Sequence, residues 1–404
     1  MPASLSGNAW PHPELITISF MPDGTNLGGK TSNLFSTFNN KFGSASTWEN
    51  IILKAAQTWA QATNINFAVV IDNGSASGAG NYQQGDPGMG DIRIGGYSFA
   101  GSSALALTDM PPPVNNYSIA GDMVFNTGQA FNVNRTYDLY TVALHEFGHA
   151  LGLDHSGLST AAMYGTYMGV HGGLSNDDIS GIESIYSNGQ PRSPDAYDAA
   201  SPNNSFTAAA NINGQINTSS MTALVTNLDI TKAGELDYYQ FTAPAGCGTS
   251  LTVKVQSQGL SLLAPTLTLY NGSQTQLATV SGAGHYGTTL TVTYNGLTAG
   301  QTYYVKVAGA DSSAFGTGAY ALTLDLGSNP SPTVPLPNTQ TANGNPLSGS
   351  GGIAEQQLFL VDSLFVLVGL LSVPDDPRVD VFDVHAPVSS IPMQDLIAAG
   401  QAHA

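Results

Sequence analysis

Three histidines stand at a spacing that could hold one metal ion. His145, His149 and His155, together with Glu146 and Gly152, spell H-E-x-x-H-x-x-G-x-x-H, a zinc-site motif with a catalytic carboxylate. On a helix, His145 and His149 project from the same face, because they are four residues apart, and Glu146 points beside the metal. Three protein ligands leave a fourth position for water, which distinguishes a catalytic zinc site from a structural one.

The third histidine requires a turn after the helix. At a rise of about 1.5 Å per residue, His155 would lie roughly 15 Å along a straight helix from His145. Gly152 stands where the chain must turn back, and glycine accepts the left-handed conformation that ends helices. Residues 137–144 predict the first half of this helix, with Asp138 near its positive end. The alternative, a helix with unrelated histidines, is disfavoured because the chain has only eight histidines in 404 residues.

The residues after the motif carry a family resemblance. His155-Ser156, followed by the segment 161–167 with Met163 and Tyr167, resembles the Met-turn region of metzincin peptidases, and of their matrixin branch in particular. The resemblance implies that Met163 forms an apolar floor beneath the zinc histidines. It also implies that Tyr167 lines the pocket for the residue after the cleaved bond. Matrixins usually carry proline where this chain has Gly165. The alternative for these residues is an ordinary place in the core.

The surrounding segments predict an α+β fold, with a metzincin-type catalytic domain made of a twisted mixed sheet and three main helices. Residues 174–186 resemble the closing helix of matrixin domains, with a capping box of Ser175 and Asp178. Ser46 and Glu49 predict another capping box before an amphipathic helix over 48–60. Strands are expected at 15–20, 66–71, 91–94, 105–107 and 122–125.

A departure from the family pattern predicts only the catalytic zinc ion. Vertebrate-type matrixins hold a second, structural zinc in segments resembling Leu-Ala-His-Ala-x-x-Pro and Gly-Asp-x-His-Phe-Asp. In this chain, the first segment aligns with residues 105–111 and the second with residues 121–126. The positions of the zinc ligands are occupied by Leu107, Val124 and Asn126. Apolar side chains cannot bind zinc. Calcium stays open, because the loop 72–90 could supply oxygen ligands, although such loops are more often turns.

A second domain is predicted after the catalytic one. Alternating apolar and polar residues at 251–255, 290–294, 303–307 and 320–324 indicate an all-β sandwich. Two short segments, 237–241 and 297–304, resemble the bacterial pre-peptidase C-terminal (PPC) domain, for which an inert spacer and a substrate-binding module both remain open. The predicted organisation is an N-terminal segment 1–12, a matrixin-like catalytic domain 13–188, a linker 189–204, a PPC-like β-sandwich 205–327, a linker 328–352 and a C-terminal segment 353–404 of unassigned role.

Composition limits the partners and the compartment. A formal charge of −18 with only ten Lys and Arg disfavours nucleic acid and anionic membranes. The apolar run 358–373 is shorter than the ~20 residues of a membrane span, so a buried or partner-binding helix is expected there. The single cysteine, Cys247, excludes an intramolecular disulfide framework. Acidic, Gly- and Ser-rich composition favours a secreted or extracellular protein, although no signal peptide is visible in residues 1–10.

These observations predict a zinc-dependent endopeptidase that hydrolyses peptide bonds in proteins. His145, His149 and His155 would bind one zinc as neutral imidazoles, and Glu146 would be the general base for a zinc-bound water as nucleophile. Protein or peptide substrates would pair with the strand at 105–107, and a monomer is expected. One alternative is a catalytically inactive extracellular adhesion or binding protein acting through its β-sandwich. In a second alternative, the β-sandwich is the functional module and the peptidase domain serves its maturation. Glu146 argues against the inactive protein, since only catalysis needs it.

Overall fold

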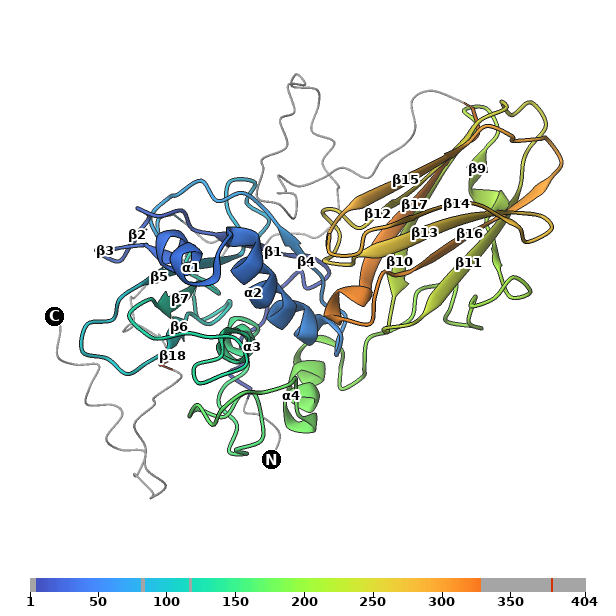
Figure 1. Ribbon diagram of the computed structural model, residues 1–404. Coiled ribbons are helices and arrows are strands. Elements are labelled where there is room, and N and C mark those ends of the chain that lie inside the picture. The colour runs from blue at the N-terminus through green and yellow to red at the C-terminus, as the bar shows by residue number, and fades with distance from the viewer. Residues whose placement is uncertain (1–4, 81–83, 116–117, 328–378, 381–404) are drawn as a thin grey trace, which may run out of the picture.

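The computed structural model describes residues 5–80, 84–115, 118–327 and 379–380. They form two units that lie side by side, one of mixed sheet and helices and one made of strands (Figure 1). None of the helices in this described part is long and apolar enough to cross a membrane. The predicted segments 328–352 and 358–373 lie outside the described residues.

The first unit is built on a six-stranded mixed sheet with the order β18-β6-β7-β5-β1-β4. Strands β1, β4, β5 and β7 run parallel, whereas β6 is antiparallel to β7 and β18 is antiparallel to β6. The five predicted strands are confirmed within one to three residues at their ends. The bounds are β1 Ile16–Phe20, β4 Phe67–Val69, β5 Ile92–Tyr97, β6 Ala106–Thr108, β7 Met123–Asn126 and β18 Val379–Asp380, with a small hairpin of β2 Asn26–Leu27 and β3 Lys30–Thr31.

The described part of this unit contains four helices, α1 Leu34–Phe42, α2 Ala45–Ala60, α3 Leu139–Ala150 and α4 Asn176–Tyr186. The prediction of three main helices therefore missed α1. Helices α2 and α3 pack against each other (Figure 1), and Trp59 of α2 donates a hydrogen bond from Nε1 to the carbonyl oxygen of Leu144 in α3, 2.8 Å away. A tryptophan ring buried with its N–H satisfied in this way fixes one helix against the other.

The two predicted capping boxes have different outcomes. Ser175 and Asp178 form the expected box at the start of α4. The box of Ser46 and Glu49 is wrong, because α2 begins at Ala45 with Ser44 as its N-cap. Glu49 is instead buried, with 7% of its surface exposed, and it lies close enough to Tyr286 of the second unit for its charge to raise the pKa of that residue.

The second unit consists of two five-stranded sheets, with the orders β15-β12-β17-β10-β9 and β14-β13-β16-β11-β8. Residues from strands of both sheets form one apolar cluster, which includes Val253, Leu322, Leu267 and Val305. The strands are β8 Ala210–Asn211, β9 Ile216–Asn217, β10 Thr222–Ile230, β11 Leu236–Thr242, β12 Leu251–Gln256, β13 Pro265–Asn271, β14 Gln276–Ser281, β15 Thr289–Tyr294, β16 Thr302–Gly309 and β17 Gly318–Asp325, with short 3-10 helices η1 Asn213–Gln215 and η2 Ala314–Gly316.

The segment 189–204, predicted as a linker, is bonded to both units. Arg192 is buried, and its Nη1 donates to the carbonyl oxygens of Ala60, Thr63 and Ile65 in the first unit. The same guanidinium pairs with Asp229 on β10 of the second unit. A buried guanidinium with this many acceptors holds the connecting segment in place.

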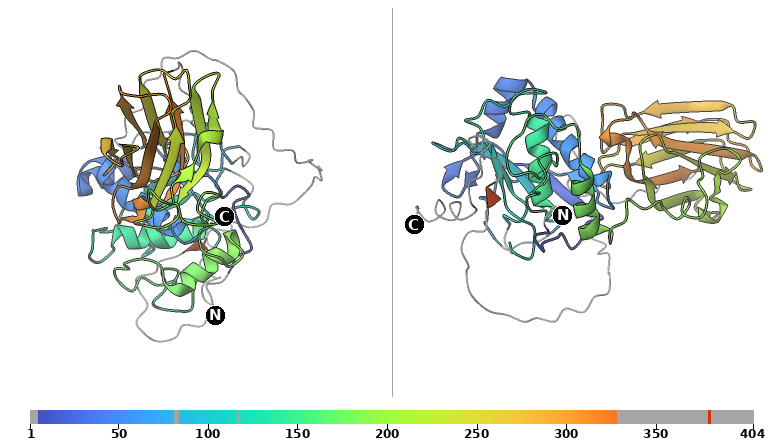
Figure 2. Two further views of the ribbon diagram at one scale, coloured as in Figure 1. Left: turned by 90° about the vertical axis from the view of Figure 1, so that its right-hand side faces the viewer. Right: turned by 90° about the horizontal axis from the view of Figure 1, so that it is seen from below.

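The two units also contact each other directly (Figure 2). Gln57 of α2 donates from Nε2 to the carbonyl oxygen of Thr317, 2.9 Å away. Leu262 and Tyr286 of the second unit belong to the apolar core of the first. Helix α2 therefore packs on the site-bearing helix α3 and also on the second unit.

The burial of Glu49 generates a prediction about stability and pH. Burial raises the pKa of Glu49 from 4.5 to about 7. Between these pH values the folded protein keeps a proton that the unfolded chain has released, so the contribution of Glu49 to stability falls as the pH rises through this window. A shift of this size corresponds to about 3 kcal/mol.

We therefore expect Glu49→Gln to leave the free energy of unfolding unchanged at pH 4.5 and to raise it by about 1–3 kcal/mol at pH 8. Denaturant unfolding at both pH values measures this difference. Glu14→Gln is the matched control, because the Glu14 side chain is 71% exposed. An equal effect of Glu49→Gln at both pH values would contradict the assignment.

Candidate metal centre

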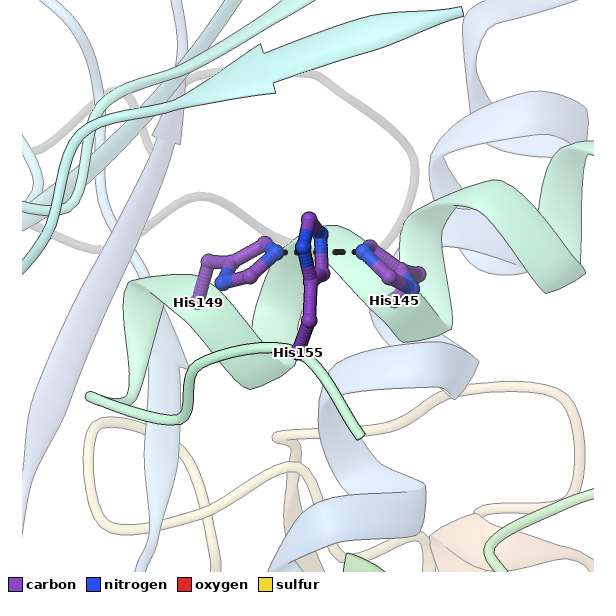
Figure 3. Close-up of side chains that lie close together, drawn as sticks. All are labelled: His145, His149 and His155. Carbon is purple, nitrogen blue, oxygen red and sulfur yellow. Dashed lines mark hydrogen bonds between the residues drawn. The ribbon is translucent and has the colours of Figure 1, made fainter. Parts of the chain in front are cut away.

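The three motif histidines converge on one point, as Figure 3 shows. Their ring centroids lie 4.8 Å apart for His145 and His149, 5.4 Å for His145 and His155, and 5.0 Å for His149 and His155. One nitrogen of each ring lies within 4.8 Å of the others. These residues could hold a metal ion, as their spacing predicts.

The local sequence explains how His155 returns to the helix. Helix α3 starts at the N-cap Asp138, whose carboxylate accepts the N–H of Thr141 at 2.9 Å. It ends at Ala150, and Gly152 has φ +97°, so the chain turns there as predicted. A Cβ on Gly152 would lie 2.1 Å from the carbonyl oxygen of Asn8. The N-terminal segment therefore packs too closely for any residue except glycine.

Backbone carbonyls orient two of the rings. Nδ1 of His145 lies 2.6 Å from the carbonyl oxygen of Ala162, and Nδ1 of His149 lies 2.7 Å from that of Leu153. A carbonyl only accepts hydrogen bonds, so each Nδ1 carries the hydrogen and each Nε2 keeps its lone pair in the neutral ring.

These lone pairs face a common space. The Nε2 atoms of His145 and His149 are 3.1 Å apart, and in these tautomers both are acceptors. Nε2 of His155 is buried and has no hydrogen-bond partner in the described part of the chain. Three imidazole nitrogens that converge in this way form a donor set that fits a zinc ion.

Burial keeps the rings neutral. Desolvation, followed by repulsion from the neighbouring imidazoles, lowers the pKa of His149 to about 3 and that of His145 well below its usual value. Burial also lowers the pKa of His155. Neutral imidazole is the form that binds a metal, so no proton has to leave these rings at pH 7 before metal binding.

Met163 packs directly beneath the metal-binding helix. It is fully buried, and a Cβ added to Gly148, between the two helical histidines, would meet its sulfur at 2.0 Å. Asp178 holds this turn, because its carboxylate accepts the N–H groups of Ala162 and Met163 at 2.9 and 3.0 Å. The sequence analysis identified Asp178 only as a helix cap.

Tyr167 lies beside the start of α3. Its hydroxyl accepts the N–H of Asp138 at 2.9 Å and donates to the carbonyl oxygen of Arg135 at 3.3 Å. Its ring meets that of Tyr137 edge to face, with centroids 5.9 Å apart. Gly165 lies against the His155 ring, where a Cβ would stand 3.0 Å from Nδ1.

Glu146 has a partner that the sequence analysis missed. Its carboxylate is buried, and Oε2 accepts a hydrogen bond from the Thr108 hydroxyl at 2.5 Å. The strand was expected to end at Leu107, whereas β6 includes Thr108. The available signal was the two-residue alternation, because Ala106 and Thr108 share the face of β6 that is turned toward the interior.

Two residues that were considered as ligands of further metal ions, Asp72 and Asn126, form hydrogen bonds with other parts of the protein. Asp72, in the loop considered for calcium, receives hydrogen bonds from Nε and Nη2 of the buried Arg93, both at 2.8 Å. Asn126 accepts two backbone N–H groups and donates to the carbonyl oxygen of Ala104. The single-zinc and calcium predictions stay predictions.

A second group of possible ligands lies where the connecting segment meets the second unit. The carboxylates of Asp198, Glu235 and Asp237 approach within 4.8 Å. Desolvation raises the pKa of Asp237 to about 9 and, with a hydrogen bond to Asp198, that of Glu235 to about 7. Tyr320 also donates to Asp237 at 2.5 Å. These carboxyl groups can satisfy one another by sharing protons.

Comparison with known proteins finds relatives that match the first unit of the chain. Residues 31–187 match the family model described as Matrixin (Peptidase_M10). Karilysin of Tannerella forsythia is 32% identical over 139 residues, which cover 34% of this chain and 28% of karilysin. Interstitial collagenase of Equus caballus is 33% identical over 175 residues, with 42% and 35% covered. Matrix metalloproteinase-20 of Homo sapiens is 34% identical over 138 residues, with 33% and 26% covered.

The chain thus spans about a third or less of the length of these curated relatives. The matched region contains all three histidines and Glu146. It is matrixin-like and includes a histidine group able to hold the catalytic zinc that such metalloproteinases use.

The geometry generates a prediction about metal content. We expect purified protein to hold one tightly bound zinc after dialysis. His149→Ala should abolish this binding, because the two histidines that are left are too few to hold zinc tightly. Elemental analysis measures both. His285→Ala, in the second unit, is the matched control and should keep its zinc. Two zinc ions per chain, or one retained by His149→Ala, would contradict a single site.

Proposed function

We propose that residues 13–188 act as a zinc-dependent endopeptidase on protein or peptide substrates. The observation that carries this proposal is that imidazole nitrogens of His145 and His149 on α3 converge with one of His155 beyond the helix. The buried carboxylate of Glu146 stands on the same helix, next to His145 in the sequence. The match to matrixins over residues 31–187 supports it.

In this mechanism, Glu146 moves the proton. Zinc held by His145, His149 and His155 would polarise the scissile carbonyl and acidify the attacking water. Glu146 accepts a proton from that water and later donates it to the leaving amine. Burial excludes bulk water from the carboxylate, so the proton that it accepts is passed within the site.

We infer that the substrate binds as an added strand on β6. In the structure β18 already lies antiparallel to this strand, with Val379 opposite Thr108 and Asp380 opposite Leu107. The edge therefore has backbone groups arranged to accept an antiparallel strand, and an extended peptide could use the same groups.

We further propose the roles of the surrounding parts. Met163 would support the zinc histidines from below, and Tyr167 would line an apolar pocket for the residue after the scissile bond. The second unit would be a PPC-like β-sandwich that accompanies the peptidase in a secreted or extracellular, monomeric protein. Its packing on α2 supports an accessory role over an independent one.

The first test concerns the general base. Glu146→Gln keeps the shape of the side chain and removes its basicity, so we expect zinc content to stay the same and peptide hydrolysis to fall by about 10²–10⁴-fold. Turnover of a fluorogenic peptide library and elemental analysis measure the two effects. Glu183→Gln on α4 is the control and should keep its activity. Unchanged turnover in Glu146→Gln would contradict the mechanism.

The second test concerns the pocket. If Tyr167 lines it, mass-spectrometric mapping of cleavage sites in a peptide library should find apolar residues directly after the scissile bond. Tyr167→Ala should widen this preference toward larger apolar residues, whereas Tyr167→Phe keeps the ring and should preserve it. A preference for charged residues at this position would show that the assignment is wrong.

A further inference from the structure

We propose that Thr108 is a positioning residue for Glu146. Its hydroxyl would fix the carboxylate and reserve one carboxylate oxygen, Oε1, for proton transfer. This inference rests on the proposed function, and it concerns a residue that the three-histidine motif does not include.

The contact is short and enclosed. Thr108 Oγ1 lies 2.5 Å from Glu146 Oε2, and the two residues are 1% and 0% exposed. An O–H to carboxylate bond of this length is charge-assisted, and burial protects it from competition by water.

The backbone of Thr108 is fixed by its neighbours in the sheet. Strand β6 pairs with β7, with Thr108 opposite Met123, and with β18 on the other side. The hydroxyl therefore comes from a rigid strand, whereas Glu146 comes from α3. A bond between two such elements orients a side chain more firmly than one from a loop.

This bond makes the two carboxylate oxygens unequal. Oε2 accepts the Thr108 hydrogen, so its electron pair is less available to a second proton. The proton from the attacking water would therefore bind Oε1 as the water O–H bond breaks. It would leave Oε1 again as the N–H bond of the leaving amine forms. The Thr108 proton stays on its own oxygen throughout, so the residue is unchanged after each cycle.

The feature belongs to this chain and not to the family motif. In the alignment with the Leu-Ala-His-Ala segment of vertebrate-type matrixins, Thr108 stands at the second alanine. Alanine has no donor, so a hydroxyl at this position adds to the common machinery. Its loss should accordingly reduce the rate without abolishing it.

The experiment compares two variants of the full-length zinc protein. Thr108→Val keeps the shape and removes the donor, and Thr108→Ser keeps the donor. We expect Thr108→Val to lower kcat about tenfold, with KM within twofold and unchanged zinc content, and Thr108→Ser to retain kcat within about threefold. Equal kcat for Thr108→Val and the native protein would overturn the proposal. So would an equal loss in Thr108→Ser, since that loss reflects packing.

A second measurement does not depend on activity. In zinc-free protein, thermal unfolding of Thr108→Val, Glu146→Ala and the double variant forms a double-mutant cycle. We expect the shift in Tm of the double variant to differ from the sum of the two single shifts. Additive shifts would show that the two side chains are not coupled by a hydrogen bond and would overturn the proposal. A native protein that hydrolyses no peptide would overturn the proposed function as well. An active native protein with an equally active Thr108→Val would overturn this inference alone.

Discussion

The structure depends on the close approach of three neutral imidazoles, whose ring nitrogens face a common space. His145 and His149 cannot turn their lone pairs away, because the carbonyl oxygens of Ala162 and Leu153 hold their Nδ1 hydrogens. The two rings do not become protonated at neutral pH either, because burial lowers their pKa values. A metal ion bound by these nitrogens would satisfy them at neutral pH, so the surrounding fold prepares the rings for metal binding.

Buried charge elsewhere in the first unit is satisfied differently. Arg93 on β5 places its guanidinium against Asp72, at 2.8 Å from both carboxylate oxygens. Asp72 follows β4, so this ion pair joins a loop to the middle of the sheet.

Much of this arrangement could be predicted from the sequence, because it is encoded locally. The histidine spacing, the turn at Gly152 and the alternation of the strands depend on residues a few positions apart. The contacts that were missed join distant positions: Thr108 and Glu146 are 38 residues apart, and Gln57 and Thr317 are 260 apart. Periodicity indicates which face of an element is buried, but it does not identify the partner. For the same reason Glu49 was assigned to a helix cap, although it is buried and lies near Tyr286 of the second unit.

Helix α2 connects the second unit to the metal centre through short, buried contacts. On one side, Trp59 donates to the carbonyl oxygen of Leu144, one residue before His145. On the other, Gln57 donates to Thr317. Near the second unit, burial and then the charge of Glu49 raise the pKa of Tyr286. The connecting segment is held to both units by Arg192. Apolar residues of the second unit complete the core around α2. Because α2 in turn packs on α3, the second unit contributes to the position of α3, which carries Glu146 and two of the histidines.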